Sequence, residues 1–251
     1  DTGIRLFVRN IPEIILDEAA QLLREHYDID GELHPLDSER DLNFRIDTDE
    51  GQYVLRFANS DDGEDVIGFQ TDALRHIHAR DPSLPIPEVV RNPQGQLMQR
   101  VTTASGSTHI LRLVSYLPGN PVEHTPVTLR SWREIGHLMG KVNVALSSFY
   151  HPSAQANDHP WDTANCLRFQ PLAKHIDDAS VRKLVTGVVA RFREHVKPRL
   201  DGTRHQIIHQ DAHPGNVLVD PSNPEHITGL IDFGDMVYGP IIADLAVIPD
   251  M

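Results

Sequence analysis

The chain has 251 residues, 39% of them hydrophobic, which is enough for one large or two small cores. Its formal net charge of −13 argues against sequence-independent binding to nucleic acid, because phosphate backbones require a basic face. No apolar run approaches the roughly 18 residues of a membrane span, and no basic and then apolar leader is visible. The single cysteine, Cys166, cannot form an internal disulfide, which fits a reducing, cytoplasmic setting.

The N-terminal part of the chain predicts a helix, a small antiparallel sheet and a second helix. Residues 11–27 carry apolar side chains at helical spacing, as do residues 65–77. The prolines of residues 82–87 end the second helix, because proline cannot continue one. Between the helices, short alternating runs joined by polar turns predict three antiparallel strands. These strands are expected within residues 31–43, 44–46 and 53–57.

Further strands are expected at Val89–Val90, residues 97–102 and residues 109–116, with Leu117-Pro-Gly-Asn120 breaking the last of them. A long helix follows over residues 128–150, because its apolar positions form one stripe that core packing explains.

Residues 151–170 are polar and marked by prolines, so a loop is expected there. Its Trp161 is interpreted as a packed anchor rather than as the roof of a pocket. Residues 172–200 return to helical spacing, and residues 206–209 predict a short strand.

Two polar clusters flank a predicted β-hairpin near the C-terminal end of the sequence. The first is His209-Gln-Asp-Ala-His-Pro-Gly-Asn216, and the second is Ile231-Asp-Phe-Gly-Asp235. Between them lie two short apolar runs separated by the turn formers Pro221-Ser-Asn-Pro224. Folding of this hairpin is expected to bring Asn216 beside Asp232.

The side chains expected to converge are Asp211, Asn216 and Asp232. Two carboxylates and one amide oxygen form a hard ligand set that suits magnesium, which prefers a few protein oxygens with phosphate and water. Phosphoryl transfer needs an aligned acceptor hydroxyl, held phosphates and charge neutralisation by metal. We therefore predict that Asp211 orients and deprotonates a hydroxyl, and that Asn216 and Asp232 bind magnesium. Taken singly, each residue is better explained as a turn residue; their order around a hairpin favours the catalytic interpretation.

The fifteen histidines are scattered and do not show the spacing of a zinc site. His209 is expected to hold the catalytic loop by hydrogen bonds. His213 is either a neighbour of the phosphates or a residue that fills the loop.

The spacing Asp-x4-Asn, then a strand pair, then Asp-Phe-Gly is that of the protein-kinase catalytic and magnesium loops. The variant His-Gln-Asp, with Asp244-Leu-Ala246 downstream, resembles the aminoglycoside phosphotransferase and choline kinase superfamily of small-molecule kinases. The resemblance is specific over residues 209–246 and compatible with almost all of the remaining chain. It implies an α+β, two-lobed protein-kinase-like fold. The N-lobe, residues 1–115, would hold five antiparallel strands and one packed helix, and the C-lobe, residues 116–251, would be mainly helical.

The resemblance also implies a nucleotide site between the lobes. The first turn of the N-lobe would cover the phosphates; it lacks Gly-x-Gly-x-x-Gly and offers Ser38, Arg40 and Asn43 instead, unless it is only a polar hairpin tip. Arg56 stands where protein kinases carry the lysine that grips the α- and β-phosphates.

Gln70 stands where these kinases place a glutamate that pairs with the strand cation, and Asp72 and Glu64 are rival candidates. With Gln70, an amide hydrogen bond to Arg56 would replace the usual ion pair. The passage between the lobes would present backbone groups to the purine edge. The residues expected there are Ser115, Tyr116 and Leu117.

The resemblance implies transfer of the γ-phosphoryl group of ATP or GTP, with magnesium, to a hydroxyl of a small molecule. The runs Arg40-Asp-Leu-Asn-Phe44 and Ile86-Pro-Glu-Val-Val90, with Gln70, are most similar to the hydroxylysine-kinase-like branch. This similarity favours an amino alcohol acceptor such as hydroxylysine or ethanolamine. Domains of this branch can be fused to others, and a chain that stops at Met251 is expected to be part of a longer polypeptide.

Other functions stay open at this point. Aminoglycosides, choline and homoserine are alternative acceptors. A pseudokinase or regulatory module is an alternative of another class; the missing glycines, Arg56 and Gln70 favour it, and the intact base and metal ligands oppose it. A protein kinase is disfavoured because no Ala-Pro-Glu follows Asp-Phe-Gly.

Overall fold

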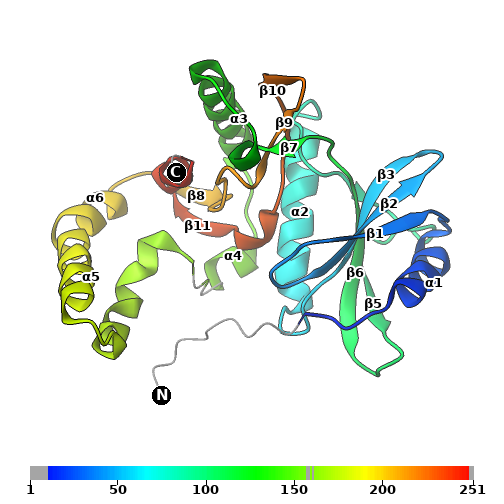
Figure 1. The fold of residues 1–251 in the computed structure, drawn as a ribbon, viewed down its shortest axis with the longest axis horizontal. Helices are drawn as coiled ribbons and strands as arrows, with labels where there is room; N and C mark the ends of the chain where they lie inside the picture. The colour runs from blue at the N-terminus through cyan, green and yellow to red at the C-terminus, as the bar shows by residue number, and fades with distance from the viewer. Residues whose placement is uncertain (1–10, 157–158, 160, 249–251) are drawn as a thin grey trace.

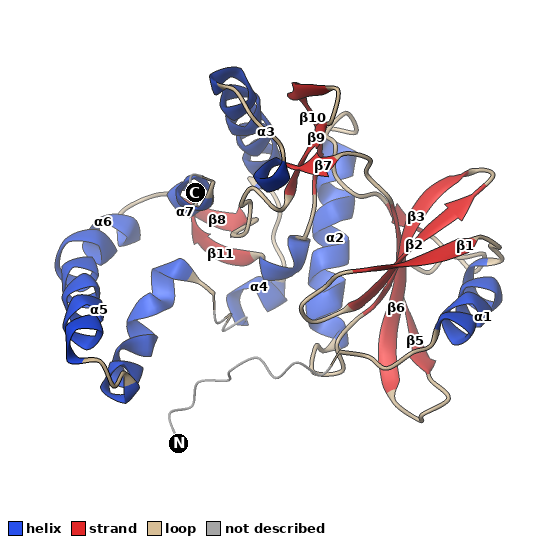
Figure 2. Ribbon diagram, in the orientation of Figure 1, coloured by secondary structure: helices blue, strands red, loops and turns tan. Residues whose placement is uncertain are grey.

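The computed structural model describes residues 11–156, 159 and 161–248. An antiparallel sheet with two helices lies on one side of the molecule, and a mainly helical region with two small sheets lies on the other (Figures 1 and 2). This is the α+β organisation expected from the sequence. Within these residues, every helix is too short or too polar to cross a bilayer.

The N-terminal sheet has the strand order β1-β2-β3-β6-β4, and β5 pairs with the opposite end of β6. All of these pairings are antiparallel. The resemblance implied five strands, and the sheet has six within the described residues, because two short separate segments both pair with β6. The elements are α1 (Leu16–Tyr27), β1 (Glu32–Leu36), β2 (Leu42–Thr48), β3 (Gly51–Phe57), α2 (Glu64–Arg80), β4 (Val89–Val90), β5 (Gln99–Thr102) and β6 (Thr108–Ser115).

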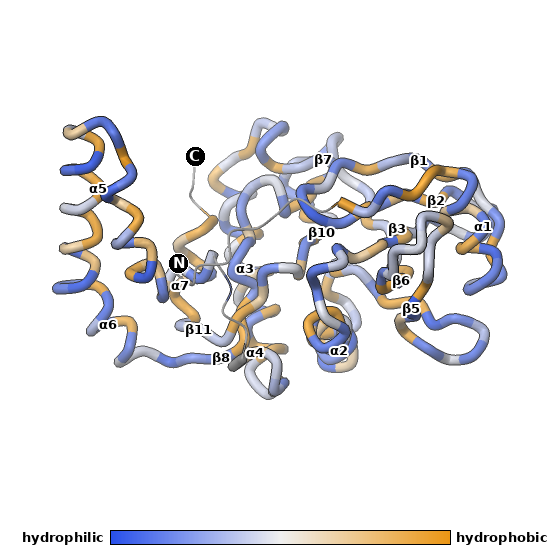
Figure 3. Tube along the Cα trace, turned by 90° about the horizontal axis from the view of Figure 1, so that it is seen from below, coloured by the Kyte–Doolittle hydropathy of each residue, from blue (hydrophilic) through white to orange (hydrophobic). Residues whose placement is uncertain are grey.

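The two faces of this sheet differ in polarity, because side chains alternate along each strand. On one face, Phe44 and Leu55 lie opposite each other and pack with apolar residues of α1. On the other face, Asn43, Arg56 and Arg112 lie opposite one another across three strands. Figure 3 shows apolar residues along the strands of the sheet and along α2. The polar row therefore faces the rest of the molecule, while α1 covers the apolar face.

Helix α3 (Leu129–Leu146) forms the centre of the C-terminal part. Thr128 caps it, since its hydroxyl accepts from the backbone N–H groups of Arg130 and Ser131. The predicted apolar stripe is buried and packs against α2 and the hairpin of residues 217–230, whereas Leu129 lies outside the core at 89% exposure. The buried residues of the stripe are Ile135, Leu138, Met139, Val142 and Leu146.

The predicted hairpin is formed by β9 and β10, and β7 extends it to three strands. Strand β8 pairs with β11 in a separate two-stranded sheet. The remaining elements are β7 (Asn120–Pro121), a 3-10 turn (Val122–His124), α4 (Pro152–Ala156), a 3-10 helix (Thr163–His175), α5 (Ala179–Arg191), a π-helical turn (Phe192–Val196), α6 (Lys197–Asp201), β8 (His205–Ile208), β9 (Val217–Asp220), β10 (Asn223–Leu230), a 3-10 turn (Phe233–Asp235), β11 (Val237–Pro240) and α7 (Ile242–Val247).

Directly after β6, the chain passes from the N-terminal sheet to the three-stranded sheet of β7, β9 and β10. Strand β6 ends at Ser115, and β7 pairs with β9 of the catalytic hairpin. Gly119 permits this crossing, because it has φ of 138° and a Cβ there would lie 2.8 Å from the carbonyl oxygen of Val219. These facts support placing the proposed lobe boundary after residue 115.

Two predictions for residues 151–170 are wrong. The segment is not a simple loop, because Pro152 begins α4 and the carboxylate of Asp162 caps a 3-10 helix by accepting from the N–H of Ala164. Trp161 is 62% exposed, so it is not a buried anchor. The link to the core is made by its backbone, whose carbonyl accepts from the side chain of Gln210 at 2.9 Å.

Met139 offers a test of the α3 core. Its side chain is fully buried, so Met139→Ala is expected to lower the free energy of unfolding by about 2–5 kcal/mol through lost burial and a residual cavity. Val144→Ala on the same helix is the control, because Val144 is 71% exposed. Urea unfolding followed by circular dichroism measures both. Equal small effects would contradict the assigned orientation of α3.

Candidate active site

A buried carboxylate fixes the start of the predicted catalytic loop. Asp244 of α7 is fully buried. It accepts hydrogen bonds from the backbone N–H of Gln210 at 2.6 Å, the backbone N–H of His209 at 3.3 Å and the side-chain amide of Asn143 at 2.9 Å. Gln210 has φ of 72°, which non-glycine residues seldom adopt. The charge-assisted bonds hold this turn, from which Asp211 follows directly.

His209 ties the loop to the strand end that carries Asp232. Its Nδ1 accepts from the backbone N–H of Asp211 at 3.2 Å, so Nε2 carries the proton and donates to the carbonyl of Ile231 at 3.1 Å. Burial lowers the pKa of His209, which keeps the ring neutral. Phe233 packs edge-on against it, with ring centroids 4.6 Å apart. The predicted structural role of His209 is confirmed.

The hairpin brings Asp211 and Asn216 together. The side-chain amide of Asn216 donates to the carboxylate of Asp211 at 2.8 Å and to its backbone carbonyl at 2.8 Å. Because the amide nitrogen is used in this way, the amide oxygen is the atom left for a metal. The backbone N–H of Ile231 donates to the carbonyl of Asn216 at 2.9 Å, so Asn216 lies next to the strand end that carries Asp232, as predicted.

Asp232 occupies a conformation that is rare for its residue type. It has φ of 61° and ψ of 74°, in the left-handed region, and its carboxylate accepts from the N–H of Gly234 at 3.2 Å. Such strained backbone clusters at functional sites, where surrounding contacts maintain it.

Three carboxylates lie close together at this point. Burial, the carboxylate of Asp235 and that of Asp232 raise the pKa of Asp211 to about 6. The imidazole Nε2 of His213, 3.7 Å from the Asp211 carboxylate, opposes this increase. The carboxylate of Asp232 and the amide oxygen of Asn216 are oxygen ligands of the kind that magnesium prefers, and a divalent cation would relieve the repulsion among the carboxylates. The described residues hold no group of three His, Cys, Asp or Glu side chains placed to bind a metal by themselves. The roles of Asn216 and Asp232 as ligands stay predictions.

The two arginines predicted to bind phosphate face carboxylates of their own lobe. Arg56 donates to Asp41 at 3.0 Å, and Asp41 also accepts from the backbone N–H of Asn59 at 3.1 Å. Burial alone would raise the pKa of Asp41, but the Arg56 guanidinium holds it below its usual range. Arg40 donates to Asp62 at 2.7 Å. The loop between β1 and β2 is thus fixed by charge pairs in place of glycine-rich backbone.

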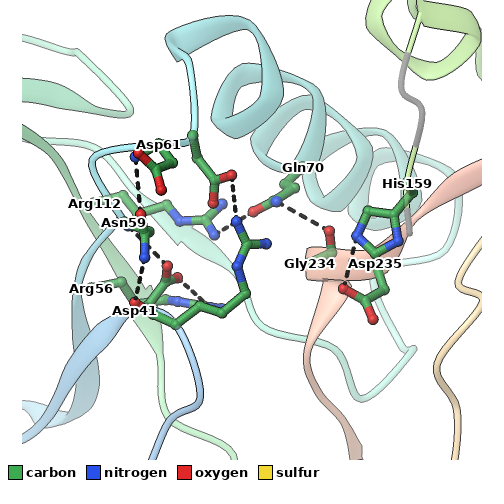
Figure 4. Close-up of polar contacts among 11 residues, drawn as sticks. Asp41, Arg56, Asn59, Asp61, Gln70, Arg112, His159, Gly234 and Asp235 are labelled. Atoms are coloured by element: carbon green, nitrogen blue, oxygen red, sulfur yellow. Dashed lines mark hydrogen bonds and ion pairs between the residues drawn. The ribbon is translucent and has the colours of Figure 1, made fainter. Parts of the chain in front are cut away.

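The hydrogen bond expected between Gln70 and Arg56 is wrong. The side-chain oxygen of Gln70 accepts from Arg112 at 2.6 Å, and its amide nitrogen donates to the carbonyl of Gly234 at 3.3 Å (Figure 4). The reason is that β6 carries a second arginine, directly opposite Arg56, which reaches α2. The rivals Asp72 and Glu64 form ion pairs elsewhere, with Arg75 and Arg100 respectively.

The other predicted nucleotide residues lie around the same sheet. Ser38 is half-buried in the turn after β1, and Asn43 lies opposite Arg56. The side-chain oxygen of Asn43 is buried and makes no hydrogen bond within the described residues, so it is free to accept one from a ligand. Phosphate binding by these residues and Arg40 stays a prediction.

The predicted adenine-edge residues Ser115, Tyr116 and Leu117 lie where the chain passes from the N-terminal sheet to the three-stranded sheet of β7, β9 and β10. The backbone N–H of Tyr116 donates to the carbonyl of Gln52 at 3.0 Å, and the Ser115 hydroxyl accepts from the backbone N–H of Glu88 at 2.9 Å. These two groups are occupied by protein contacts. Recognition of a purine at this point stays a prediction.

Sequence reasoning missed three polar residues. Arg112 carried a signal, since it is a lone charge in the otherwise apolar strand of residues 109–116. Asp41 lies in the turn for which only Ser38, Arg40 and Asn43 were named as candidate phosphate ligands. His159, whose Nε2 lies 3.1 Å from the carboxylate of Asp235 (Figure 4), carried no signal, because the contact joins segments distant in sequence.

A carboxylate held by an amide lies beside the end of a hairpin that carries a second carboxylate, which is the arrangement that the sequence predicted for a kinase-like site. The family described as "Phosphotransferase enzyme family" (APH) matches residues 32–251. The chain therefore belongs to the phosphotransferase enzyme family.

Among characterised proteins, the chain is similar to hydroxylysine kinase of Danio rerio, with 30% identity over 226 residues, and of Mus musculus, with 26% over 238 residues. Each comparison covers 86% of this chain and 63% of the relative, so the chain spans just under two thirds of these kinases. It is also 24% identical over 207 residues to homoserine kinase of Pseudomonas aeruginosa, covering 82% of this chain and 59% of that protein. The similarity to the hydroxylysine-kinase branch is confirmed.

Solved structures confirm the predicted fold. A microcompartment-associated aminopropanol kinase has a TM-score of 0.74 at 22% identity, covering 93% of this chain and 73% of its own. Spectinomycin phosphotransferase APH(9)-Ia, in complex with ADP and spectinomycin, has a TM-score of 0.67 at 16% identity, covering 94% of this chain and 74% of its own. Identities this low establish the two-lobed kinase-like fold alone.

The raised pKa of Asp211 predicts a pH-dependent effect on stability. A carboxyl whose pKa is higher in the folded than in the unfolded state lowers stability once it ionises, and the cost disappears below both pKa values. Asp211→Asn, which keeps an oxygen for Asn216, is therefore expected to raise the free energy of unfolding at pH 7.5 by on the order of 1–2 kcal/mol. The gain should become small near pH 4, where Asp211 is largely protonated in the folded state. Denaturant unfolding at both pH values measures it.

Asp30→Asn is the control for this experiment, because Asp30 is exposed and pairs only weakly, at 3.4 Å, with Arg24. It should change stability at neither pH. A gain for Asp211→Asn that is equal at pH 4 and pH 7.5 would show that ionisation of Asp211 is not its cause.

Proposed function

We propose that this chain is the catalytic part of a small-molecule kinase, which transfers the γ-phosphoryl group of ATP or GTP to a hydroxyl of an amino alcohol such as hydroxylysine or ethanolamine. The observation that carries the proposal is the 2.8 Å hydrogen bond from Asn216 to Asp211, made at the hairpin end that also carries Asp232. This arrangement supplies a base, its orienting partner and two oxygen ligands for magnesium.

Each residue has a distinct role in the proposed reaction. The Asp211 carboxylate orients the acceptor hydroxyl and takes its proton as the oxygen attacks the γ-phosphorus, and the bond from the γ-phosphorus to the β,γ-bridging oxygen breaks. The Asn216 amide keeps the carboxylate in place, and its oxygen, with the Asp232 carboxylate, would hold magnesium. When bound, magnesium neutralises charge on the phosphate oxygens.

The nucleotide site of the proposal lies under the N-terminal sheet. Arg56 binds the α- and β-phosphates, and the turn with Ser38, Arg40 and Asn43 covers them. The backbone between residues 115 and 117 recognises the purine. A lobe boundary after residue 115 and a cytoplasmic location belong to the same proposal; the single cysteine supports the latter.

Two independent facts support an amino alcohol as the acceptor. The relatives include hydroxylysine kinases, and the structurally similar proteins include an aminopropanol kinase. Near the base, the carboxylate of Asp235, which is not assigned to magnesium, contributes negative charge that attracts an acceptor with an ammonium group. A large antibiotic acceptor is less favoured, since the antibiotic kinases are similar at only 14–18% identity.

The base assignment predicts a selective loss of turnover. Nucleotide consumption is measured with magnesium, ATP or GTP, and a panel of acceptors: hydroxylysine, ethanolamine, aminopropanol, homoserine and spectinomycin. We expect the amino alcohols to stimulate turnover by wild type, and Asp211→Asn to reduce kcat by about 10²–10⁴-fold without loss of nucleotide binding. Asp220→Asn, an identical change at the other end of the hairpin, is the control. Unchanged acceptor-dependent turnover in Asp211→Asn would exclude Asp211 as the base.

The nucleotide assignment predicts an effect on substrate affinity. Removing Arg56 alone would leave Asp41 buried without its partner, so Asp41→Asn and Arg56→Met are combined. The combined variant is expected to raise KM for the nucleotide at least tenfold, with a smaller effect on KM for the acceptor. Arg100→Met serves as the control, because Arg100 is 63% exposed. A nucleotide KM equal to that of wild type would place the phosphates elsewhere.

A further inference from the structure

Arg112 is a buried cation that the proposed reaction does not use. It lies on β6, directly opposite Arg56 on β3, and only 2% of its surface is exposed. A guanidinium cannot lose its proton at neutral pH, so the sheet holds two positive charges side by side. Asp41 pairs with Arg56, which leaves one positive charge in this cluster without an acidic partner.

The contacts of Arg112 are neutral. It donates to the side-chain oxygen of Gln70 at 2.6 Å and more weakly to the Thr71 hydroxyl at 3.5 Å. Its Nε has no hydrogen-bond partner within the described residues, and no ion pair of Arg112 is found among them. Burial and the neighbouring Arg56 lower the pKa of Arg112 to about 9. Keeping a cation here costs stability, so packing alone does not explain its presence.

Gln70 joins this cation to the loop that carries Asp232. Its oxygen accepts from Arg112, and its nitrogen donates to the carbonyl of Gly234 at 3.3 Å. Figure 4 shows the Gln70 side chain between these two groups. The chemistry fixes the amide orientation, because a guanidinium can only donate and a carbonyl can only accept. Arg112 therefore holds Gln70 with its N–H group directed at the loop.

A glutamate at this position could not do the same. It would neutralise Arg112 better, as the usual kinase ion pair does, but an ionised carboxylate has no N–H to donate to Gly234. Two oxygens would then face each other, and the link to the loop would be lost. An arginine that forms no ion pair within the described residues, combined with a glutamine, suits transmission of position from the sheet to the loop.

We propose that Arg112 and Gln70 form a positioning relay that sets the Asp232-Phe-Gly loop for binding of the metal-nucleotide complex. The proposal rests on the proposed function. Arg112 is enclosed and acts through Gln70, so it is a positioning residue. The backbone at Asp232 is left-handed, and such a turn persists only where surrounding contacts maintain it. The hydrogen bond from Gln70 to Gly234 is one such contact.

The test is binding of Mn²⁺ in the presence of non-hydrolysable analogues of ATP and GTP, followed by electron paramagnetic resonance. Gln70→Glu is expected to weaken Mn²⁺ binding about tenfold while its thermal unfolding midpoint stays equal to that of wild type or rises, because Arg112 gains a charged partner. A purely structural role of Gln70 predicts the opposite: a lower midpoint with unchanged Mn²⁺ affinity. Gln94→Glu, in an exposed turn, is the matched control.

A double-mutant cycle completes the test. If the two residues act as one relay, Arg112→Met and Gln70→Leu each weaken Mn²⁺ binding, and their combination weakens it no further than one change alone. Additive effects, or Mn²⁺ affinity in Gln70→Glu equal to that of wild type, would overturn the relay and leave the proposed function intact. Failure of wild type itself to bind Mn²⁺ with either nucleotide would overturn both.

Discussion

The site depends on the buried carboxylate of Asp244, which lies more than thirty residues after the backbone that it holds. A buried charge is tolerated only when hydrogen bonds replace its hydration. Here the donors come from the catalytic loop and from Asn143 of α3, and Gln206 of β8 in turn donates to Asn143 at 2.8 and 3.0 Å. One group thereby fixes α7, α3 and the loop, and the left-handed turn at Gln210 is maintained without glycine.

The packing of the hairpin fixes the positions of the residues that are proposed to be catalytic. Val217, Val219 and Leu230 are buried in the same core as residues of α2 and α3. The neutral ring of His209 closes the open end of the hairpin by bonding both polar clusters. Alignment of a base with its substrate lowers a reaction barrier only if the base is already held in place. Asp211 is therefore held against the packed core by the hydrogen bonds that it forms with His209 and Asn216.

Local patterns predicted most of the fold and the convergent side chains, while long-range contacts explain the errors. The hairpin and its flanking clusters were predictable because turn formers and alternating apolar runs are local signals. The partner of Gln70 was not, because residue 112 is 42 positions away and only strand register places it beside Arg56. Trp161 was assigned by residue type, and the structure exposes its ring while its backbone carbonyl makes the contact to Gln210.

The two sides of the site carry opposite charges. One side suits the negative phosphates of a metal-nucleotide complex, and the other suits its positive metal ion. The sheet presents Arg56 and Arg112, of which Arg56 pairs with the buried carboxylate of Asp41, and the hairpin end presents Asp211, Asp232 and Asp235. The field of Asp232 already reaches both arginines, so the two sides partly compensate each other. A phosphate chain alone would be repelled by the carboxylates, and a cation alone by the arginines. Binding of the two together satisfies both sides, which favours joint over separate occupation.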